Sequence, residues 1–402
     1  MSRGITAPKG FQAAGFYTGV KRKRKDLSMM VSKSPMNWAA LFTTNVVKAA
    51  PVIWGESLLK AGKPLQALVI NSGNANACTG DQGDADLQKM VAQTAMTLSV
   101  PETSVLIAST GVIGVPLPIE KIIAGIPQVA NFLDSSQQAD DDACQGIMTT
   151  DTFFKQASMT IEIQGKEVTL GGMAKGSGMI HPNMATMLAF VTTDAKIETA
   201  LLQELLKEAS DESYHMISVD GDTSTNDTVA VFANGQSNVL ISKDGQGYQA
   251  FKEAFFKIHQ TLAIAIVSDG EGAGKLIEAQ VVGAATKEAA KRMARSIVSS
   301  SLVKTAFFGE DANWGRILCA MGYSGADFNP KEVGIQIQSQ QGLIDLMKGG
   351  VPIVFNEDVA AKILSEEKLQ VLVTIQDGEE SATAWGCDLS YEYVKINGEY
   401  RT

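Results

Sequence analysis

One threonine stands where it could become a nucleophile. A glycine-rich segment, residues 171–178, leads through Pro182 to Ala185 and Thr186, and an apolar run begins at Met187. The Thr186 hydroxyl could attack the carbonyl of Ala185, and hydrolysis of the resulting ester would release a chain that begins with Thr186. Its new α-amine, with an unperturbed pKa of about 7.7–8.0, could then act as general base for the hydroxyl on the same residue. On spacing alone, a plain structural threonine is the alternative.

A threonine–glycine pair follows a second apolar run. Thr110 and Gly111 come directly after Val105–Ser109, a run rich in strand-forming residues. At the end of a strand, such a pair can direct hydrogen-bond donors at a developing oxyanion. On spacing alone, a tight turn is the alternative.

A glycine-rich segment at residues 269–276 (DGEGAGKL) resembles a phosphate-binding loop but does not match the sequence pattern of one. A G-x-x-x-x-G-K-[ST] loop that includes Lys275 would need glycine at position 269 and serine or threonine at position 276. Asp269 and Leu276 stand there instead, so we expect no nucleotide binding by this loop. Glu271 is then either a single acid in a loop that another molecule can approach closely, or an ordinary exposed turn residue.

The composition of the chain limits the classes of protein to which it can belong. The 402 residues are 45% hydrophobic, and 34 Lys and Arg against 44 Asp and Glu give a net charge of −10. A folded globular protein is expected, and the absence of a basic excess argues against general nucleic-acid binding. No apolar run reaches the ~18 residues of a membrane span. The N-terminus lacks the charged-then-apolar pattern of a signal peptide.

The cysteines and histidines do not predict a metal site. Four scattered cysteines without a C-x-x-C pair indicate a reduced, cytoplasmic protein without a disulfide framework. Three histidines without zinc spacing predict no metal site, and we interpret His215 and His259 as structural. The basic run at residues 21–25 (KRKRK) is typical of a solvated turn or strand edge, with a localisation signal or an anion site as alternatives.

Hydrophobic periodicity predicts a mixed fold. Helices are expected over residues 84–98, 197–205, 251–262, 286–303 and 356–364. Strands are expected at Ala67–Asn71, Val105–Ser109, Met159–Gln164, Met187–Thr192, Thr228–Phe232, Ala263–Val267, Gly334–Gln338 and Leu369–Ile375. This mixture without strict alternation predicts an α+β fold, a layered sandwich of mixed β-sheets with helices. We expect a main α+β domain over residues 1–275 and a second α+β domain over 276–402.

The segment around Thr186 resembles the self-cleavage motif of a known family. Residues 175–188 read KGSGMIHPNMATML, and further segments agree in order and spacing. They are FTTN at 42–45, AAP at 49–51, NSGNANA at 71–77, STGVIG at 109–114, TTDT at 149–152, SVDGDTSTND at 218–227, DGEGA at 269–273, NWGR at 313–316, YVKIN at 393–397 and YRT at 400–402. Nearly the whole chain thus resembles the ArgJ family, the glutamate N-acetyltransferase/ornithine acetyltransferases.

The resemblance implies an activity and an assembly. The family moves an acetyl group from N2-acetylornithine to glutamate in arginine biosynthesis by a ping-pong route, and its fold resembles that of the DmpA-type self-processing aminopeptidases. Autocatalytic cleavage between Ala185 and Thr186 would give chains 1–185 and 186–402, which are expected to associate as an α2β2 heterotetramer. No cofactor is implied. Some members also acetylate glutamate from acetyl-CoA, and the sequence leaves this second activity open.

The resemblance also assigns roles to individual residues. Thr186 is implied as cleavage residue and acyl-accepting nucleophile, and Thr110 and Gly111 as the oxyanion-stabilising pair. Positions that match the family's substrate-binding residues are Thr149, Lys175, Thr186, Glu271, Asn397 and Thr402. Lys175 can pair with the α-carboxylate that both amino acids carry, and Glu271 with the ammonium group of ornithine. Asn397 and Thr402 can bind substrate only if the C-terminal tail returns to the active site.

Two other interpretations remain open on the sequence. A related self-processed amidase or aminopeptidase, or an acyltransferase with another acceptor, would use the same nucleophile. An uncleaved binding or regulatory protein would keep the fold with the Ala185–Thr186 bond intact. Lys175, Glu271 and the tail with Asn397 and Thr402 favour amino-acid transfer over the first. The presence of the whole set of site residues argues against the second.

Overall fold

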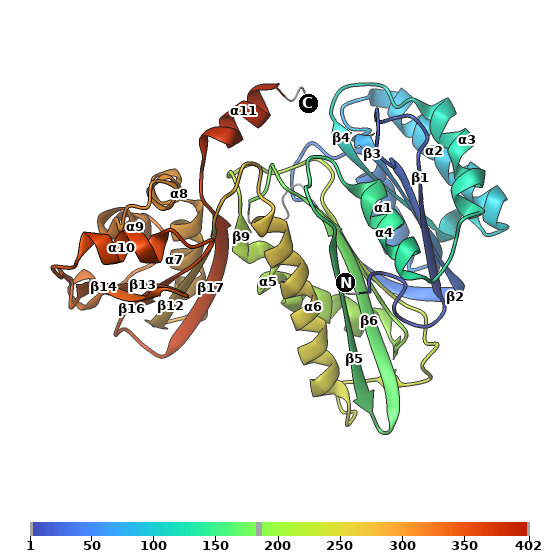
Figure 1. Ribbon diagram of the computed structural model, residues 1–402. Coiled ribbons are helices and arrows are strands. Elements are labelled where there is room, and N and C mark those ends of the chain that lie inside the picture. Colours follow the sequence, from blue (N-terminus) through green and yellow to red (C-terminus); the bar gives the residue numbers. More distant parts are fainter. Residues whose placement is uncertain (1–2, 182–186, 400–402) are drawn as a thin grey trace.

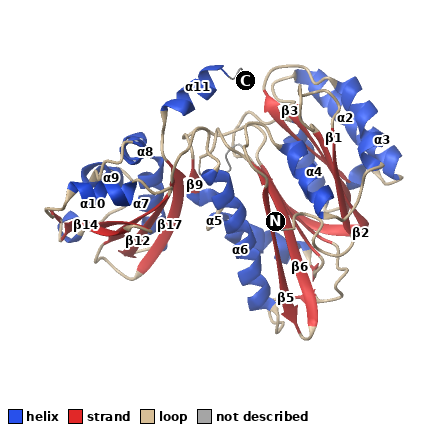
Figure 2. Cartoon of the chain, viewed as in Figure 1, coloured by secondary structure: helices blue, strands red, loops and turns tan. Residues whose placement is uncertain are grey.

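Two large β-sheets with helices packed around them make up the molecule (Figure 1). The computed structural model describes residues 3–181 and 187–399. Both sheets contain parallel and antiparallel strand pairs, and helices and strands alternate irregularly along the chain (Figure 2). The predicted α+β class with layered, mixed sheets is confirmed.

The first sheet carries the segments around which the chemistry was predicted. Its order is β4 (Val105–Val112), β3 (Leu65–Asn74), β2 (Leu27–Phe42), β10 (Thr228–Ala233), β7 (Leu188–Thr193), β6 (Lys166–Lys175) and β5 (Lys155–Ile163), and β1 (Phe11–Phe16) pairs with β2. The β3–β4 and β7–β10 pairs are parallel. Thr110 and Gly111 therefore lie near the end of β4, and Lys175 is the last residue of β6.

The second sheet comes mostly from the C-terminal part of the chain. Its order is β15 (Val351–Pro352), β14 (Gly342–Lys348), β13 (Gly334–Ser339), β16 (Lys368–Thr374), β12 (Leu276–Ala284), β17 (Glu380–Cys387) and β9 (Ile217–Ser218). A separate parallel pair joins β8 (Lys196–Ile197) and β11 (Leu240–Ile241). Of the strands that the structure describes, β9 alone reaches this sheet from before residue 276, and the domain boundary at 275/276 stays a prediction.

The helices fall into three groups around the sheets. Against the first sheet pack α1 (Ala50–Ala61), α2 (Gly80–Leu98), α3 (Ile119–Ala130) and α4 (Gln137–Ile147). Helices α5 (Thr199–Asp211) and α6 (Tyr248–Ser268) pack against β2, β5 and β6 of the same sheet, and α6 also contacts β17, so one hydrophobic core reaches both sheets. The second sheet carries α7 (Lys287–Ser299), α8 (Ser301–Phe308), α9 (Trp314–Gly322) and α10 (Glu357–Leu364), and α11 (Tyr391–Glu399) follows it.

Two element predictions were wrong. Ala263–Val267 is not a strand but continues α6, because its buried positions 263, 266 and 267 repeat with the helical period and join those at 258, 259 and 262. The Asp269–Leu276 loop therefore follows a helix rather than a strand. The helix expected over 286–303 is two helices, since extended Ser300 ends α7 and its hydroxyl caps α8 by accepting from the Val303 amide.

Candidate active site

Six of the predicted residues from segments far apart in the sequence line one recess. They are Thr110, Gly111, Thr149, Lys175, Glu271 and Asn397. The open space is about 590 Å³, including the part that opens to solvent, which is the size range of small-molecule sites. Ala185, Thr186 and Thr402 lie outside the described residues. The structure thus brings the described candidates together, and their roles remain predictions.

The backbone conformation and surroundings of Gly111 leave no room for a side chain. Its φ is +132°, and a Cβ would stand 2.3 Å from the Gly73 carbonyl carbon and 2.5 Å from the Asn74 nitrogen. Strands β3 and β4 approach so closely here because Gly73 pairs with Gly111 in the parallel register. Any larger residue would push the backbone away from the recess.

The Lys175 side chain crosses the floor of the recess to Thr110. Its Nζ lies 3.3 Å from Thr110 Oγ1, and the side chain is buried. An ammonium group only donates, so the Thr110 hydroxyl accepts this bond and keeps its own proton for another partner. Burial lowers the pKa of Lys175, although the nearby Asp151 carboxylate acts in the opposite direction.

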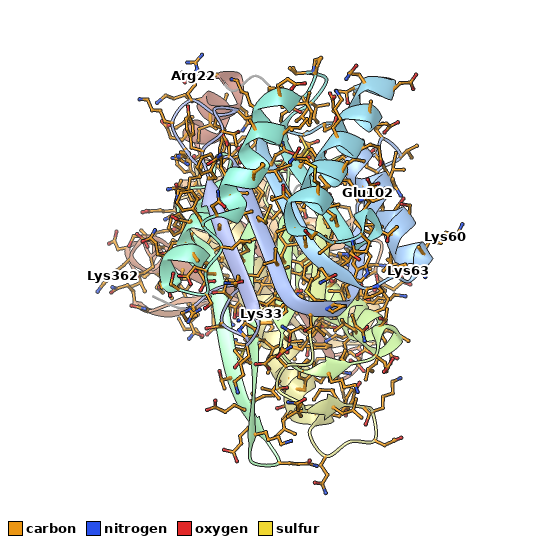
Figure 3. The ribbon with its side chains drawn as sticks, turned by 90° about the vertical axis from the view of Figure 1, so that its right-hand side faces the viewer. Arg22, Lys33, Lys60, Lys63, Glu102 and Lys362 are labelled. Atoms are coloured by element: carbon orange, nitrogen blue, oxygen red, sulfur yellow. The ribbon has the colours of Figure 1, made fainter. Side chains whose placement is uncertain are left out.

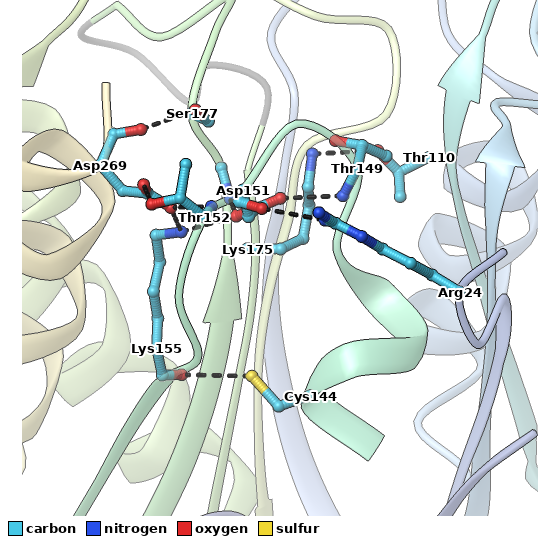
Figure 4. A network of polar contacts seen from close by, with 11 residues as sticks. Arg24, Thr110, Cys144, Thr149, Asp151, Thr152, Lys155, Lys175, Ser177 and Asp269 are labelled. Atoms are coloured by element: carbon cyan, nitrogen blue, oxygen red, sulfur yellow. Dashed lines mark hydrogen bonds and ion pairs between the residues drawn. The ribbon is translucent and has the colours of Figure 1, made fainter. Parts of the chain in front are cut away.

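A buried ionic network supports the recess from below (Figure 4). Asp151 accepts bonds from the backbone amides of Thr149 (2.9 Å), which lines the recess, and Gly176 (2.8 Å), which follows Lys175. Lys155 Nζ bridges Asp151 (2.7 Å) and Asp269 (2.5 Å), and all three side chains are buried. Burial alone raises the pKa of Asp151, but Lys175 and Lys155 outweigh it and hold this pKa well below its usual value.

The network continues into the loop that carries Glu271. Thr152 donates from its amide to Asp269 (2.9 Å), and Ser177 donates from its hydroxyl to the Asp269 carbonyl (2.6 Å). The Glu271 amide in turn donates to the Ser177 carbonyl (2.9 Å). The 176–181 segment and the 269–273 loop are therefore fixed to each other, which sets the distance between Lys175 and the Glu271 carboxylate.

Glu271 itself lies between a glycine and the C-terminal helix. A Cβ on Gly178 would stand 2.3 Å from Glu271 Oε2, so only glycine leaves room for this carboxylate. Asn397 Nδ2, from α11, donates to the same oxygen (2.8 Å). Ser390 anchors the start of the tail through a 2.6 Å bond to the Gly272 carbonyl. Helix α11 thus brings Asn397 to the recess, and the role predicted for the tail there stays a prediction.

The start of β7 is held by a buried carboxylate. Asp227 Oδ1 accepts the amide of Met187 (3.0 Å), the residue joined covalently to Thr186. The other oxygen, Oδ2, has no hydrogen-bond partner among the described residues. Burial raises the pKa of Asp227 well above its usual value. Because Leu188 and Thr228 are parallel partners, this carboxyl group lies beside Met187, the residue that follows the predicted nucleophile in the sequence.

Sequence reasoning missed the residues that hold the recess together. Asn226 lines it and donates to the carbonyls of Ala75 (2.6 Å) and Ser109 (2.8 Å), which connects β10 to the ends of β3 and β4. Asp227, Asp151, Lys155 and Asp269 were not singled out either. The motifs at 149–152, 218–227 and 269–273 contain four of these five residues, but only the fold shows that the motifs meet.

The described residues contain no group of three or more His, Cys, Asp and Glu side chains that could hold a metal ion. Of the described helices, none is long and apolar enough to cross a membrane. His259 is buried beside the Tyr214 hydroxyl (3.1 Å), and burial lowers its pKa to about 3. His215 contacts Asp211 (2.8 Å). Neither ring lines the recess.

Comparison with known proteins identifies the family. The model of the ArgJ family matches residues 12–402. The chain belongs to the ArgJ family. A relative from Caldanaerobacter subterraneus subsp. tengcongensis, named arginine biosynthesis bifunctional protein ArgJ, is 51% identical, and the match covers 99% of this chain and 98% of that one. The protein of the same name from Listeria monocytogenes is 50% identical over 99% of this chain and 98% of its own.

Two solved structures are also similar to this chain. The arginine biosynthesis bifunctional protein ArgJ of Bacillus halodurans is 46% identical, with a TM-score of 0.44 over 45% of this chain and 94% of that chain. The ornithine acetyltransferase of Mycobacterium tuberculosis, solved in complex with ornithine, is 38% identical, with a TM-score of 0.40 over 45% of this chain and 95% of that chain.

Proposed function

We propose that this ArgJ-family chain transfers the acetyl group of N2-acetylornithine to glutamate in arginine biosynthesis. The observation that carries the proposal is the recess, in which Lys175 and Glu271 lie beside the Thr110–Gly111 pair. One cation and one anion suit an amino acid with an α-carboxylate and a side-chain ammonium group. Glutamate presents the same α-carboxylate to Lys175, so a single recess serves donor and acceptor in turn.

The nucleophile we propose is Thr186, freed by cleavage after Ala185. Its hydroxyl attacks the acetyl carbonyl, its own α-amine takes the proton, and Thr110 and Gly111 donate to the oxyanion. The Lys175–Thr110 bond supports this role, because the Thr110 hydroxyl must then direct its proton elsewhere. Ornithine leaves, and the amine of glutamate attacks the acetyl-Thr186 ester.

Substrate orientation in this proposal rests on the walls of the recess. The Lys175 ammonium group pairs with the α-carboxylate, and the Glu271 carboxylate with the ornithine ammonium. Thr149, Asn397 and Thr402 supply neutral hydrogen bonds. Asn397 already donates to Glu271 Oε2, which leaves the other oxygen of this carboxylate for a cationic substrate.

We also propose the finer properties that the family implies. The cleaved chains 1–185 and 186–402 stay associated as α2β2, in the cytoplasm. The relatives' designation as bifunctional supports a second activity, in which acetyl-CoA donates the acetyl group to glutamate. This donor would acylate the same threonine, so no separate nucleophile is needed.

The proposal is tested by trapping the acyl-enzyme. Purified protein is mixed with N2-acetylornithine without glutamate, and the masses of both chains are measured. We expect one added acetyl group on the chain that begins at Thr186, released by glutamate as N-acetylglutamate. Thr186→Ala is expected to remain uncleaved and unlabelled, whereas Thr186→Ser separates hydroxyl chemistry from methyl packing. Release of the acetyl group to water faster than to glutamate would instead indicate an amidase.

A further inference from the structure

The basic run of the sequence forms an exposed loop that the proposed mechanism does not use. Residues 21–25 lie between β1 and β2, and Arg22, Lys23 and Arg24 are exposed. The side chains of Arg22 and Lys23 make no hydrogen bond or ion pair with the residues that the structure describes, so their charges face solvent. Such a cluster is notable in a chain whose net charge is −10.

This loop is held in one conformation. The buried Asp26 carboxylate accepts bonds from the amides of Thr18 (2.7 Å), Gly19 (3.1 Å) and Lys21 (3.0 Å). Lys121 Nζ donates to the Gly19 carbonyl (2.8 Å) from α3. The exposed charges therefore stand on a fixed loop, so little conformational entropy is lost when a ligand binds them.

The loop lies against the wall of the recess. Lys21 Nζ donates to the Met148 carbonyl (2.9 Å) and Arg24 Nη1 to the Asp151 carbonyl (3.1 Å). These two carbonyls flank residues 149 and 150, both of which line the recess. Figure 4 shows Arg24 reaching this segment beside Thr149 and Lys175. Burial lowers the pKa of Lys21 to about 8. Lys21 and Arg24 anchor the loop through these bonds, and Lys25 pairs with Asp142, so the free charges are those of Arg22 and Lys23.

We propose that Arg22 and Lys23 bind the phosphate groups of a nucleotide-linked acyl donor, acetyl-CoA, whose thioester arm reaches into the recess. This rests on the proposed function, since it assigns a site to the second donor. Arginine and lysine bind phosphate oxygens strongly. The Asp269–Leu276 loop offers no phosphate-binding pattern and presents the Glu271 carboxylate, which repels phosphate. The basic loop, which is joined to the wall of the recess at Met148 and Asp151, would attract it.

The transfer from this donor balances without another reactant. The Thr186 hydroxyl attacks the thioester carbonyl, the carbon–sulfur bond breaks, and the proton taken up by the α-amine passes to the sulfur. Coenzyme A leaves as the thiol, and the acetyl-Thr186 ester is the same intermediate that N2-acetylornithine gives. Only the first half-reaction with acetyl-CoA therefore uses the loop, which makes the role donor-specific.

The test compares three acetyl donors in one double variant. Arg22→Ala/Lys23→Ala is assayed with acetyl-CoA, with acetylpantetheine, which lacks the nucleotide phosphates, and with N2-acetylornithine. The matched control is Lys60→Ala/Lys63→Ala, which removes two exposed charges from another side of the molecule (Figure 3). We expect kcat/KM for acetyl-CoA to fall about 10- to 100-fold in the loop variant, the loss of one or two charged hydrogen bonds. The other two donors and the control should stay within about 2-fold of wild type.

Kinetics and binding each give results that would overturn the inference. An equal loss with all three donors would mean that the loop supports the fold of the recess, and no loss would mean that it is a solvated turn. Binding of coenzyme A to the full chain, followed by calorimetry, separates this inference from the proposed function. Binding that the loop variant loses, without any acetyl transfer by wild type, would uphold the loop site and refute the proposed function. Transfer from N2-acetylornithine without coenzyme A binding, or inorganic phosphate competing as well as 3′,5′-ADP, would refute the loop site alone.

Discussion

Lys155→Met should destabilise the protein by removing a cation that bridges two buried carboxylates. Lys155 is 1% exposed and contacts Asp151 at 2.7 Å and Asp269 at 2.5 Å. Methionine fills a similar volume but leaves both carboxylates without that partner. Removal of one member of a buried ion pair costs about 3–5 kcal/mol. We therefore expect the free energy of unfolding in urea to fall by about that amount at pH 7.

The stability lost in Lys155→Met should become smaller as the pH falls. The pKa of Asp151 is held well below its usual value in the folded protein, so the stability it contributes is present above the unfolded pKa and is lost as the pH falls through the folded one. Without Lys155 this pKa rises, and protonation removes the uncompensated charge. The stability difference between variant and wild type should therefore be largest at neutral pH and shrink towards about pH 4.

A matched control, Lys304→Met, separates the effect of losing the ion pair from the effect of replacing a buried lysine. Lys304 is also buried, but its Nζ donates to the carbonyl oxygen and Sγ of Cys387 rather than to a carboxylate. Lys304→Met should cost about 1–3 kcal/mol with little pH dependence below neutrality. Lys155→Met/Asp269→Asn should recover part of the loss. A loss below about 1 kcal/mol in Lys155→Met, or one independent of pH, would refute the reasoning.

Three further substitutions test the recess. Gly111→Ala should lower kcat about 100-fold or more, as loss of an oxyanion donor does, because its Cβ would collide with the Gly73 backbone; steady-state kinetics with a circular dichroism spectrum check this, and wild-type kcat would argue against it. Glu271→Gln keeps the acceptor for Asn397 but removes the charge, so KM for N2-acetylornithine should rise about 10-fold, one charged hydrogen bond, with a smaller change for glutamate. Because burial lowers the pKa of Lys175, KM should rise as the pH increases through that lowered value. Lys175→Arg should move this rise in KM to higher pH. An unchanged dependence of KM on pH would exclude Lys175 as the titrating group.

The sequence was most informative where local patterns decide the structure. Asn356 before an apolar helical period correctly marks the start of α10, since its side chain caps the helix. The junction before Met187 was placed within one residue of β7. The apolar run at 263–267 misled, because a short buried segment has the same composition in a strand and in a helix. The 16-residue β2 was missed, since Ser34 and Pro35 interrupt its pattern at the irregularity between Val31 and Met36.

The residues that line the site could be predicted from the sequence, but the buried residues that hold them in place could not. Lys175 and Glu271 stand in motifs that the family resemblance carries, so their numbers could be predicted before the fold was known. The bridge from Lys155 to Asp269 spans 114 positions along the chain, and nothing in local spacing predicts such a contact. Buried charges of this kind depend on which strands become neighbours, a property of the whole sheet.

The central claim is that Thr186 becomes an N-terminal nucleophile, and the mass of the purified protein tests it most directly. Intact-mass measurement with N-terminal sequencing should find chains 1–185 and 186–402, the second beginning Thr-Met-Leu-Ala. Thr186→Ala, prepared in parallel, should give one uncleaved chain. A wild-type protein that transfers acetyl groups while Ala185 and Thr186 remain joined would contradict the account.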